Sequence, residues 1–397
     1  MVEQRVAIVH EWLITLGGSE KVLVELLAMF PEADLFAVVD FLPAEHRAGL
    51  RGKSVKTSFI QCLPFAARRY KAYLPLMPIA VEQFDLSSYN LVISSSHAVA
   101  KGVLTGPNQT HICYCHSPIR YAWDLQHQYL RESGLTRGIK SHLARLVLHY
   151  LRIWDVRSAA GVDLFIANSA YIARRIRKAY RREAVVVHPP VDMEAFSLQN
   201  HKENFYVTAS RMVSYKRIDI IIEAFAKMPG RRLVVIGDGP DREKLRALGA
   251  ENITFLGYQN DTVLKSHLQR ARGFVFAAEE DFGILPVEAQ ACGTPVIAYA
   301  AGGALETVLP AGNSLGLPAT GVFFAEQTPA AVCAAVTRFE SLRFDPQNCR
   351  AWAERFSRMA FAEAMRAQIM AMLPAAPISA RPVSVKSTNR YDVDLAG

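Results

Sequence analysis

The chain has 397 residues, 51% of them hydrophobic, and a formal net charge of +8 at pH 7. A chain of this length exceeds the span over which one hydrophobic core usually grows, so it predicts two sizeable domains. No apolar stretch reaches the ~20 residues of a membrane-spanning helix, and the amino terminus lacks the charged-then-apolar pattern of a secretory signal. We therefore expect neither a membrane span nor secretion.

The cysteine spacing indicates the cellular compartment of the protein, and the charge bears on the class of its binding partners. Cys113 and Cys115 are the only cysteines close together, and their spacing on one strand face fits buried small residues better than a disulfide or a metal site. We expect a reducing, cytoplasmic location. The positive charge would suit nucleic acid, but RNA-binding aromatic signatures and zinc-finger spacings are missing. We therefore expect no nucleic-acid partner.

A buried strand is predicted at residues 6–10, and a Gly-Gly-Ser-Glu loop follows it and enters a helix. Gly17 and Gly18 would let the backbone approach a ligand closely. A plain tight turn before a capped helix explains the same residues equally well.

Two segments combine basic residues with aromatic and aliphatic ones. The first surrounds Arg68, Arg69 and Lys71, and the second covers residues 137–157 with apolar residues at helical spacing. This combination is typical of a helix on an anionic membrane surface. A core helix with a solvated charged face has the same pattern, so both interpretations stay open.

His116 ends a strand predicted at residues 110–115 and is followed by Ser117 and Pro118. Histidine is versatile in catalysis and in binding, but one at a strand end is more often structural than functional. The residue alone does not decide between the two roles.

Strands alternate with helical stretches, which predicts an α/β fold of doubly wound parallel sheets. Examples are the apolar runs at residues 91–94, 164–167, 233–236 and 295–298. The prolines at 189–190 and the polar stretch 198–204 interrupt this pattern. We place an N-terminal domain at residues 1–190 and a C-terminal domain at residues 191–351. Residues 374–397 lack apolar periodicity and are interpreted as a mobile tail.

Two cations follow a strand predicted at residues 205–208. Arg211 offers a planar guanidinium and Lys216 a compact ammonium, and both suit phosphate oxygens. A solvated loop would carry the same residues.

A turn between a buried strand at residues 273–277 and a helix that begins near Pro286 is the most informative segment. Its freed backbone N–H groups would face an anion, with the helix dipole favouring negative charge. These groups belong to Phe282, Gly283, Ile284 and Leu285. Glu280 and Glu288 can overhang the same crevice and offer oxygens to sugar hydroxyls. Simple pairing of acidic residues with the helix dipole is the alternative.

The order of these motifs carries a resemblance. Ser-Arg-x4-Lys at 210–216, Val-Ile-Gly-Asp-Gly-Pro at 235–240, Glu-x7-Glu at 280–288 and Gly-Thr-Pro-Val at 293–296 together resemble a retaining glycosyltransferase of family 4. The run at 114–124, with its His-Ser-Pro sequence, is similar to members that transfer mannose in bacterial exopolysaccharide and O-antigen synthesis.

This resemblance implies the GT-B architecture, in which two Rossmann-like domains face a central cleft and a C-terminal helix near residues 352–373 completes the first domain. It also implies transfer of mannose from GDP-mannose to a polyprenyl-diphosphate-linked glycan on the cytoplasmic side. Attachment of the two basic and aromatic segments to an anionic membrane surface would suit such an acceptor. A UDP-sugar donor is the first alternative. A sugar-nucleotide epimerase or phosphorylase and a noncatalytic nucleotide-sensing scaffold are the others.

The resemblance further implies roles for single residues. Glu288 would hold the ribose hydroxyls, Glu280 the sugar hydroxyls and His116 the far edge of the sugar. Gly18 would lie against the donor phosphate or the acceptor.

The departing diphosphate would be stabilised by Arg211, Lys216 and the amides near Gly283. These groups take the place of a divalent ion, so we expect neither a metal nor another cofactor.

Overall fold

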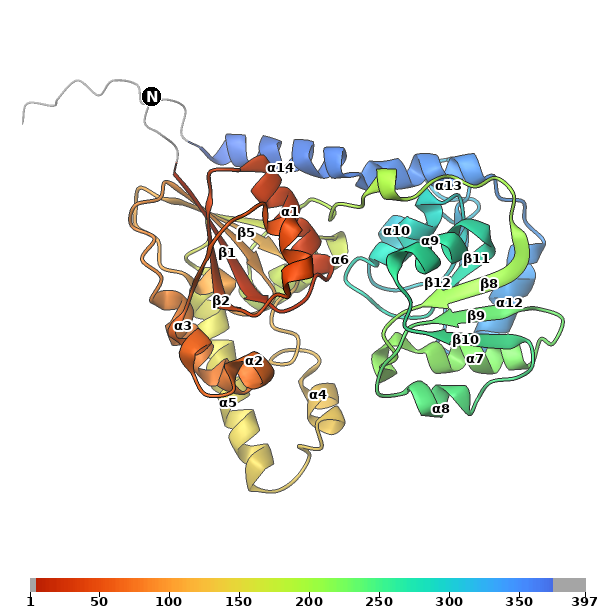
Figure 1. The fold of residues 1–397 in the computed structure, drawn as a ribbon, viewed down its shortest axis with the longest axis horizontal. Coiled ribbons are helices and arrows are strands. Elements are labelled where there is room, and N and C mark those ends of the chain that lie inside the picture. Colours follow the sequence, from red (N-terminus) through yellow and green to blue (C-terminus); the bar gives the residue numbers. More distant parts are fainter. Residues whose placement is uncertain (1–4, 374–397) are drawn as a thin grey trace, which may run out of the picture.

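The structure is a computed structural model that describes residues 5–373 (Figure 1). The tail predicted at residues 374–397 lies outside the described residues. Among residues 5–373, no helix combines the length and the apolar character needed to cross a bilayer.

The N-terminal domain is built on a seven-stranded parallel sheet with the order β3-β2-β1-β4-β5-β6-β7. Its strands are β1 (Val6–Leu13), β2 (Asp34–Asp40), β3 (Val55–Thr57), β4 (Leu91–Ser96), β5 (Thr110–Cys115), β6 (Leu164–Ala167) and β7 (Ala184–Val186). Helices cover both faces of this sheet, so its central strands β1, β4 and β5 are buried almost throughout rather than alternately buried and exposed. Ile8 of β1 is aligned with Ile93 of β4, which is aligned with Ile112 of β5, and all three are fully buried.

The C-terminal domain repeats this plan with a six-stranded parallel sheet of order β10-β9-β8-β11-β12-β13. Its strands are β8 (Glu203–Ala209), β9 (Leu233–Ile236), β10 (Ile253–Gly257), β11 (Ala271–Phe276), β12 (Val296–Tyr299) and β13 (Gly321–Phe324). The two sheets confirm the predicted α/β fold with two Rossmann-like domains.

Helices connect the parallel strands and cover the sheets (Figure 1). In the N-terminal half they are α1 (Gly18–Met29), α2 (Ala66–Arg69), α3 (Met77–Glu82), α4 (Gln126–Glu132), α5 (Ile139–Ala159) and α6 (Ala170–Tyr180). The others are α7 (Ile218–Ala226), α8 (Arg242–Arg246), α9 (Asp261–Arg270), α10 (Ile284–Ala291), α11 (Ala304–Thr307), α12 (Pro329–Glu340), α13 (Pro346–Ala353) and α14 (Arg358–Met372).

Each strand order reverses direction at one point, which is where an open α/β sheet binds its ligand. The reversal lies between β1 and β4 in the first sheet and between β8 and β11 in the second. Loops at the carboxyl ends of these strands therefore supply the site.

The chain passes between the domains twice, and the two passages lie side by side. The backbone N–H of Val191, on the first passage, donates to the carbonyl of Phe356 on the second, at 2.8 Å. Phe356 packs in the core of the C-terminal domain, whereas Phe361 and Met365 of α14 pack in the core of the N-terminal domain. The helix that returns therefore begins at Arg358, later than the predicted residue 352.

Replacement of Phe361 by Ala should lower the free energy of unfolding by about 3–5 kcal/mol, because its side chain is 2% exposed and would leave a cavity. Denaturant unfolding followed by circular dichroism measures the change. The control is Met359→Ala on the same helix. Because this side chain is 71% exposed, its removal should change the free energy of unfolding by less than about 0.5 kcal/mol. Equal effects of the two changes would show that α14 is not anchored by its buried face.

Candidate active site

A cavity of about 870 Å³ lies between the domains, at the carboxyl ends of the central strands. We call it the central cavity. It brings together most of the residues predicted for the site, which are Gly18, His116, Arg211, Lys216, Glu280, Phe282, Gly283, Ile284 and Leu285. Glu288 lines an adjoining cavity of about 570 Å³ instead.

The turn before α10 has the geometry of an anion site. Gly283 adopts a positive φ of 82°, which glycine tolerates without strain, and α10 begins at the next residue. The backbone N–H groups of residues 282–285 donate to no acceptor within residues 5–373. Because polar backbone groups are normally paired, these N–H groups are free to bind a ligand at the cavity wall.

Two cations line the same cavity, and they differ in their pairing with other side chains. The Lys216 ammonium forms an ion pair with Glu280. The exposed Arg211 guanidinium has no ion pair or hydrogen bond within residues 5–373. Arg120 reaches across from the N-terminal domain to pair with Asp281, a contact that motif spacing did not predict. The cavity therefore concentrates positive charge beside two carboxylates.

Glu280 and Glu288 do not share one pocket, although the sequence suggested a common crevice. Glu288 is 4% exposed on α10, and its Oε1 accepts from the Lys21 ammonium of α1 at 2.7 Å. The two cavities adjoin along Gly18 and Ile284. The carboxylates therefore face two consecutive sections of one groove.

His116 is held by a chain of buried and partly buried hydrogen bonds. Its Nε2 lies 2.8 Å from the Ser95 hydroxyl, which lies 3.1 Å from Nδ1 of His10. His10 Nε2 in turn lies 3.4 Å from the Glu20 carboxylate, which also accepts from the backbone N–H of Gly17 at 2.9 Å. The chain thus joins the cavity histidine to the glycine loop within the N-terminal domain.

The charge states along this chain follow from their surroundings. Burial raises the pKa of Glu20, but the hydrogen bond and charge of His10 outweigh it and bring this pKa down to about 2. Burial, with His97 and His10 nearby, holds the pKa of His116 well below its ordinary value. His116 is therefore neutral at pH 7 and offers a hydroxyl group either an N–H or a lone pair.

Glu11 is a second buried carboxylate that the sequence analysis missed. It accepts from the Ser96 hydroxyl at 2.9 Å and from the backbone N–H groups of residues 97–100 at 2.7–3.1 Å. These bonds fix the loop after β4 that carries His97 into the cavity. The available signal was the polar pair His10–Glu11 within an otherwise apolar strand, since a buried carboxylate needs several donors.

Glycines allow the site loops to rest on neighbouring backbone. A Cβ atom on Gly302, whose φ is +62°, would overlap the carbonyl oxygen of Glu280, and one on Gly237 would overlap that of Ser210. The N–H of Gly303 donates to the Glu280 carbonyl at 2.8 Å. These contacts support the loops of Arg211 and Glu280 from behind.

Residues 16–195 match the family model described as Glycosyltransferase Family 4, and residues 191–356 match the model described as Glycosyl transferases group 1. The chain is built from these two glycosyltransferase domains. The resemblance to family 4 is thereby confirmed, while the mannosyltransferase subtype stays a prediction.

Curated relatives include the D-inositol 3-phosphate glycosyltransferases of Mycobacterium marinum and Mycobacterium bovis, each 34% identical over 167 and 168 residues, respectively. These matches cover 36% of this chain, and 36% and 35% of the relatives. The chain thus spans about a third of the length of the curated relatives it matches.

Solved structures share the fold at low sequence identity. The Anabaena protein Alr3699/HepE in complex with UDP has a TM-score of 0.64 and 18% identity, over 93% of this chain and 100% of that chain. Sucrose-phosphate synthase from Thermosynechococcus elongatus has a TM-score of 0.69 and 19% identity, with the same coverage. These likenesses support the two-domain GT-B fold.

Replacement of Gly302 by Ala should lower kcat at least about tenfold, because the new methyl group displaces the backbone of Glu280 by sterics alone. Steady-state kinetics with a verified donor measures this loss. The matched control is Gly312→Ala, which also has a positive φ, of 73°, but has no atom within 4 Å of the added methyl group. Normal turnover of the Gly302 variant would contradict the supporting role.

Proposed function

We propose that the protein is a retaining, metal-independent glycosyltransferase that moves mannose from GDP-mannose to a lipid-linked glycan. One observation carries the proposal. The N–H groups of residues 282–285, which find no acceptor among the described residues 5–373, converge with Arg211 and Lys216 on one cavity. As the anomeric bond breaks, negative charge develops on the diphosphate. Donors and cations fixed at that point lower the barrier.

The remaining residues orient the donor. Glu288 holds the ribose hydroxyls in the adjoining cavity, and Glu280 holds hydroxyls of the sugar in the central one. Neutral His116 binds the far edge of the sugar. Gly18, which has no side chain, lets the loop of the N-terminal domain lie close to Ile284 of the C-terminal domain. Binding requires Lys216 to exchange the Glu280 carboxylate for phosphate, which leaves Glu280 free for the sugar.

The two carboxylates do not work as a glycosidase pair. Each is matched to a lysine, and they face different sections of the groove. The acceptor oxygen forms its bond to the anomeric carbon on the face that the diphosphate leaves. The hydroxyl proton passes to the leaving phosphate, so no enzyme nucleophile is needed.

A donor screen with membrane lipid extract tests the activity. We expect GDP release from GDP-mannose only together with a glycosidic product, unchanged by EDTA because fixed cations serve the diphosphate. Sugar change without an acceptor would favour the epimerase, and tight nucleotide binding without turnover would favour the sensor. Preference for a UDP-sugar would correct the donor, and loss of activity with EDTA that magnesium restores would correct the metal independence.

Arg211→Ala in the same assay should lower turnover roughly ten- to hundredfold, because a charge-assisted hydrogen bond contributes about 1.5–3 kcal/mol. Arg232→Ala is the control, since this exposed arginine directly precedes β9 and does not line the central cavity. Equal turnover of the two variants would remove Arg211 from the mechanism.

The proposal includes attachment to an anionic membrane, supported by α5. Its inner face packs in the domain core through Leu148 and Leu151. Its outer face exposes an apolar row with exposed fractions from 42% to 87%, formed by Ile139, Leu143, Leu146, Tyr150 and Ile153. Asp155, the only carboxylate of α5, is fully buried, so the charged side chains that α5 itself exposes beside this row are cations. A surface of this kind suits anionic lipid headgroups.

The double variant Leu143→Ser/Leu146→Ser should lose co-flotation with phosphatidylglycerol-containing vesicles, because less apolar surface enters the interface. Turnover of a water-soluble acceptor should be unchanged. Leu104→Ser/Leu315→Ser is the control, with side chains that are 63% and 59% exposed elsewhere. Failure of the unaltered protein to float with these vesicles would contradict the membrane attachment.

A further inference from the structure

A third cavity, of about 690 Å³, lies beside α4 and continues the groove on the side away from Glu288. We call it the α4 cavity. It shares wall residues with the central cavity, namely Arg120, Tyr129, Tyr215 and Asp281. The central cavity in turn adjoins the Glu288 cavity at its other boundary. The three cavities therefore form a consecutive series with the proposed sugar position in the middle.

This order of cavities indicates on which side of the proposed sugar position each substrate lies, and this inference rests on the proposed function. The nucleoside end of the donor extends from the central cavity toward Glu288. An acceptor hydroxyl that attacks the donor sugar must then enter from the other side, because the nucleotide fills the first. The α4 cavity is the space that remains for the rest of the acceptor.

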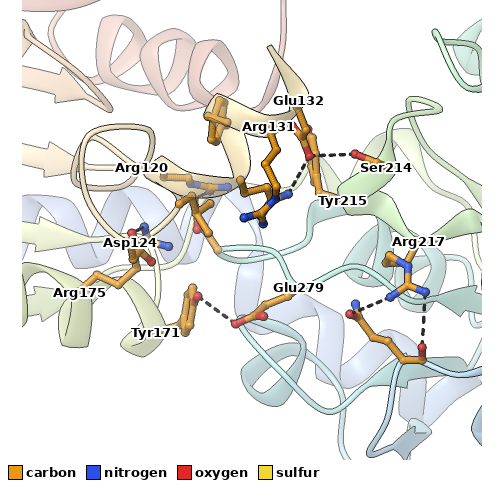
Figure 2. Close-up of a pocket in the computed structure, with 15 residues that line it drawn as sticks. Arg120, Asp124, Arg131, Glu132, Tyr171, Arg175, Ser214, Tyr215, Arg217 and Glu279 are labelled. Atoms are coloured by element: carbon orange, nitrogen blue, oxygen red, sulfur yellow. Dashed lines mark hydrogen bonds and ion pairs between the residues drawn. The ribbon is translucent and has the colours of Figure 1, made fainter. Parts of the chain in front are cut away.

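The walls of the α4 cavity are charged but balanced (Figure 2). Arg175 pairs with Asp124 at 2.5 Å, and Arg120 pairs with Asp281. In all, four arginines and four carboxylates line it, so their formal charges cancel and leave no excess of positive charge for a phosphate. Paired charges instead offer donors and acceptors side by side, which matches hydroxyl groups that both donate and accept.

Aromatic rings complete this pattern. Tyr129, Tyr171 and Tyr215 line the cavity, and Figure 2 shows Tyr171 directed toward Glu279, to which its hydroxyl donates at 3.0 Å. Flat apolar faces next to polar groups suit the alternating faces of sugar rings. A volume of this size falls within the range of sites for drug-sized ligands, which are larger than one monosaccharide.

We propose that the α4 cavity is an acceptor subsite, which binds neutral sugar units that follow the accepting residue. The subsite takes its walls from both domains, since Ser214 of the C-terminal domain donates to Glu132 of α4 at 2.9 Å. A bound glycan therefore bridges the domains next to the reaction centre. The chemistry that recognises it is that of an uncharged oligosaccharide.

The test compares octyl glycosides of one, two and three neutral hexose units, with the donor identified by the screen. The value of kcat/KM should rise at least tenfold from one unit to three. Gln128→Trp fills the α4 cavity without touching the central one, so it should abolish this rise and preserve the rate with one unit. His127→Trp, at an exposed neighbouring position of α4, should preserve both.

Direct binding of the same glycosides, measured by saturation-transfer NMR on the enzyme loaded with nucleoside diphosphate, gives a second readout. The three-unit glycoside should bind, and Gln128→Trp should weaken it. If donor cleavage persists but no neutral glycoside is bound or extended, this subsite is wrong while the transferase activity stands. The value of kcat/KM could instead rise only when the acceptor carries a phosphomonoester, and Gln128→Trp could remove that rise. This result would show an anion site and would also overturn the proposal.

Discussion

The site depends on a backbone constraint, which is that the N–H groups of residues 282–285 have no acceptor in the part of the chain that the structure describes. An unpaired polar backbone group is costly unless water or a ligand satisfies it. The turn keeps this arrangement because Gly283 adopts a positive φ and because the loop at Gly302 supports it from behind. The same turn carries Glu280, so the position of one carboxylate and that of the anion site are set together.

Across the groove, carboxylates of the C-terminal domain meet donors of the N-terminal domain. Glu306 accepts from the backbone N–H groups of Ala170 and Tyr171 at the start of α6 and lies 3.1 Å from His188. Burial raises the pKa of Glu306, but His188 and these N–H groups outweigh it and lower the pKa. Glu306 is thus ionised and joins the domains outside the three cavities. A ligand can then displace the Lys216–Glu280 pair without loss of this contact.

The fold could be predicted from the sequence because apolar runs that are buried on both faces leave a local signal, and β6 and β9 have the predicted bounds. Arg211 and Glu280 could be found because they follow such strands. The chain from Glu20 through His10 and Ser95 could not, since it joins elements distant in sequence through side-chain contacts that spacing does not encode. Likewise, the separation of Glu288 from Glu280 depends on the direction of α10.

The exposed apolar row lies on α5, and α4 lines the α4 cavity; these two helices belong to one continuous segment and extend from the same side of the N-terminal domain (Figure 1). Only residues 133–138 separate the two helices, so their adjoining ends lie at most about 25 Å apart. If α5 rests on a bilayer, the α4 cavity opens close to the headgroups. The charged diphosphate of a lipid-linked acceptor can then stay among the cations at the surface, while its neutral sugars reach the balanced walls of the cavity. Under the proposed function, this division of charge is the reason why the cavity needs no excess of arginine.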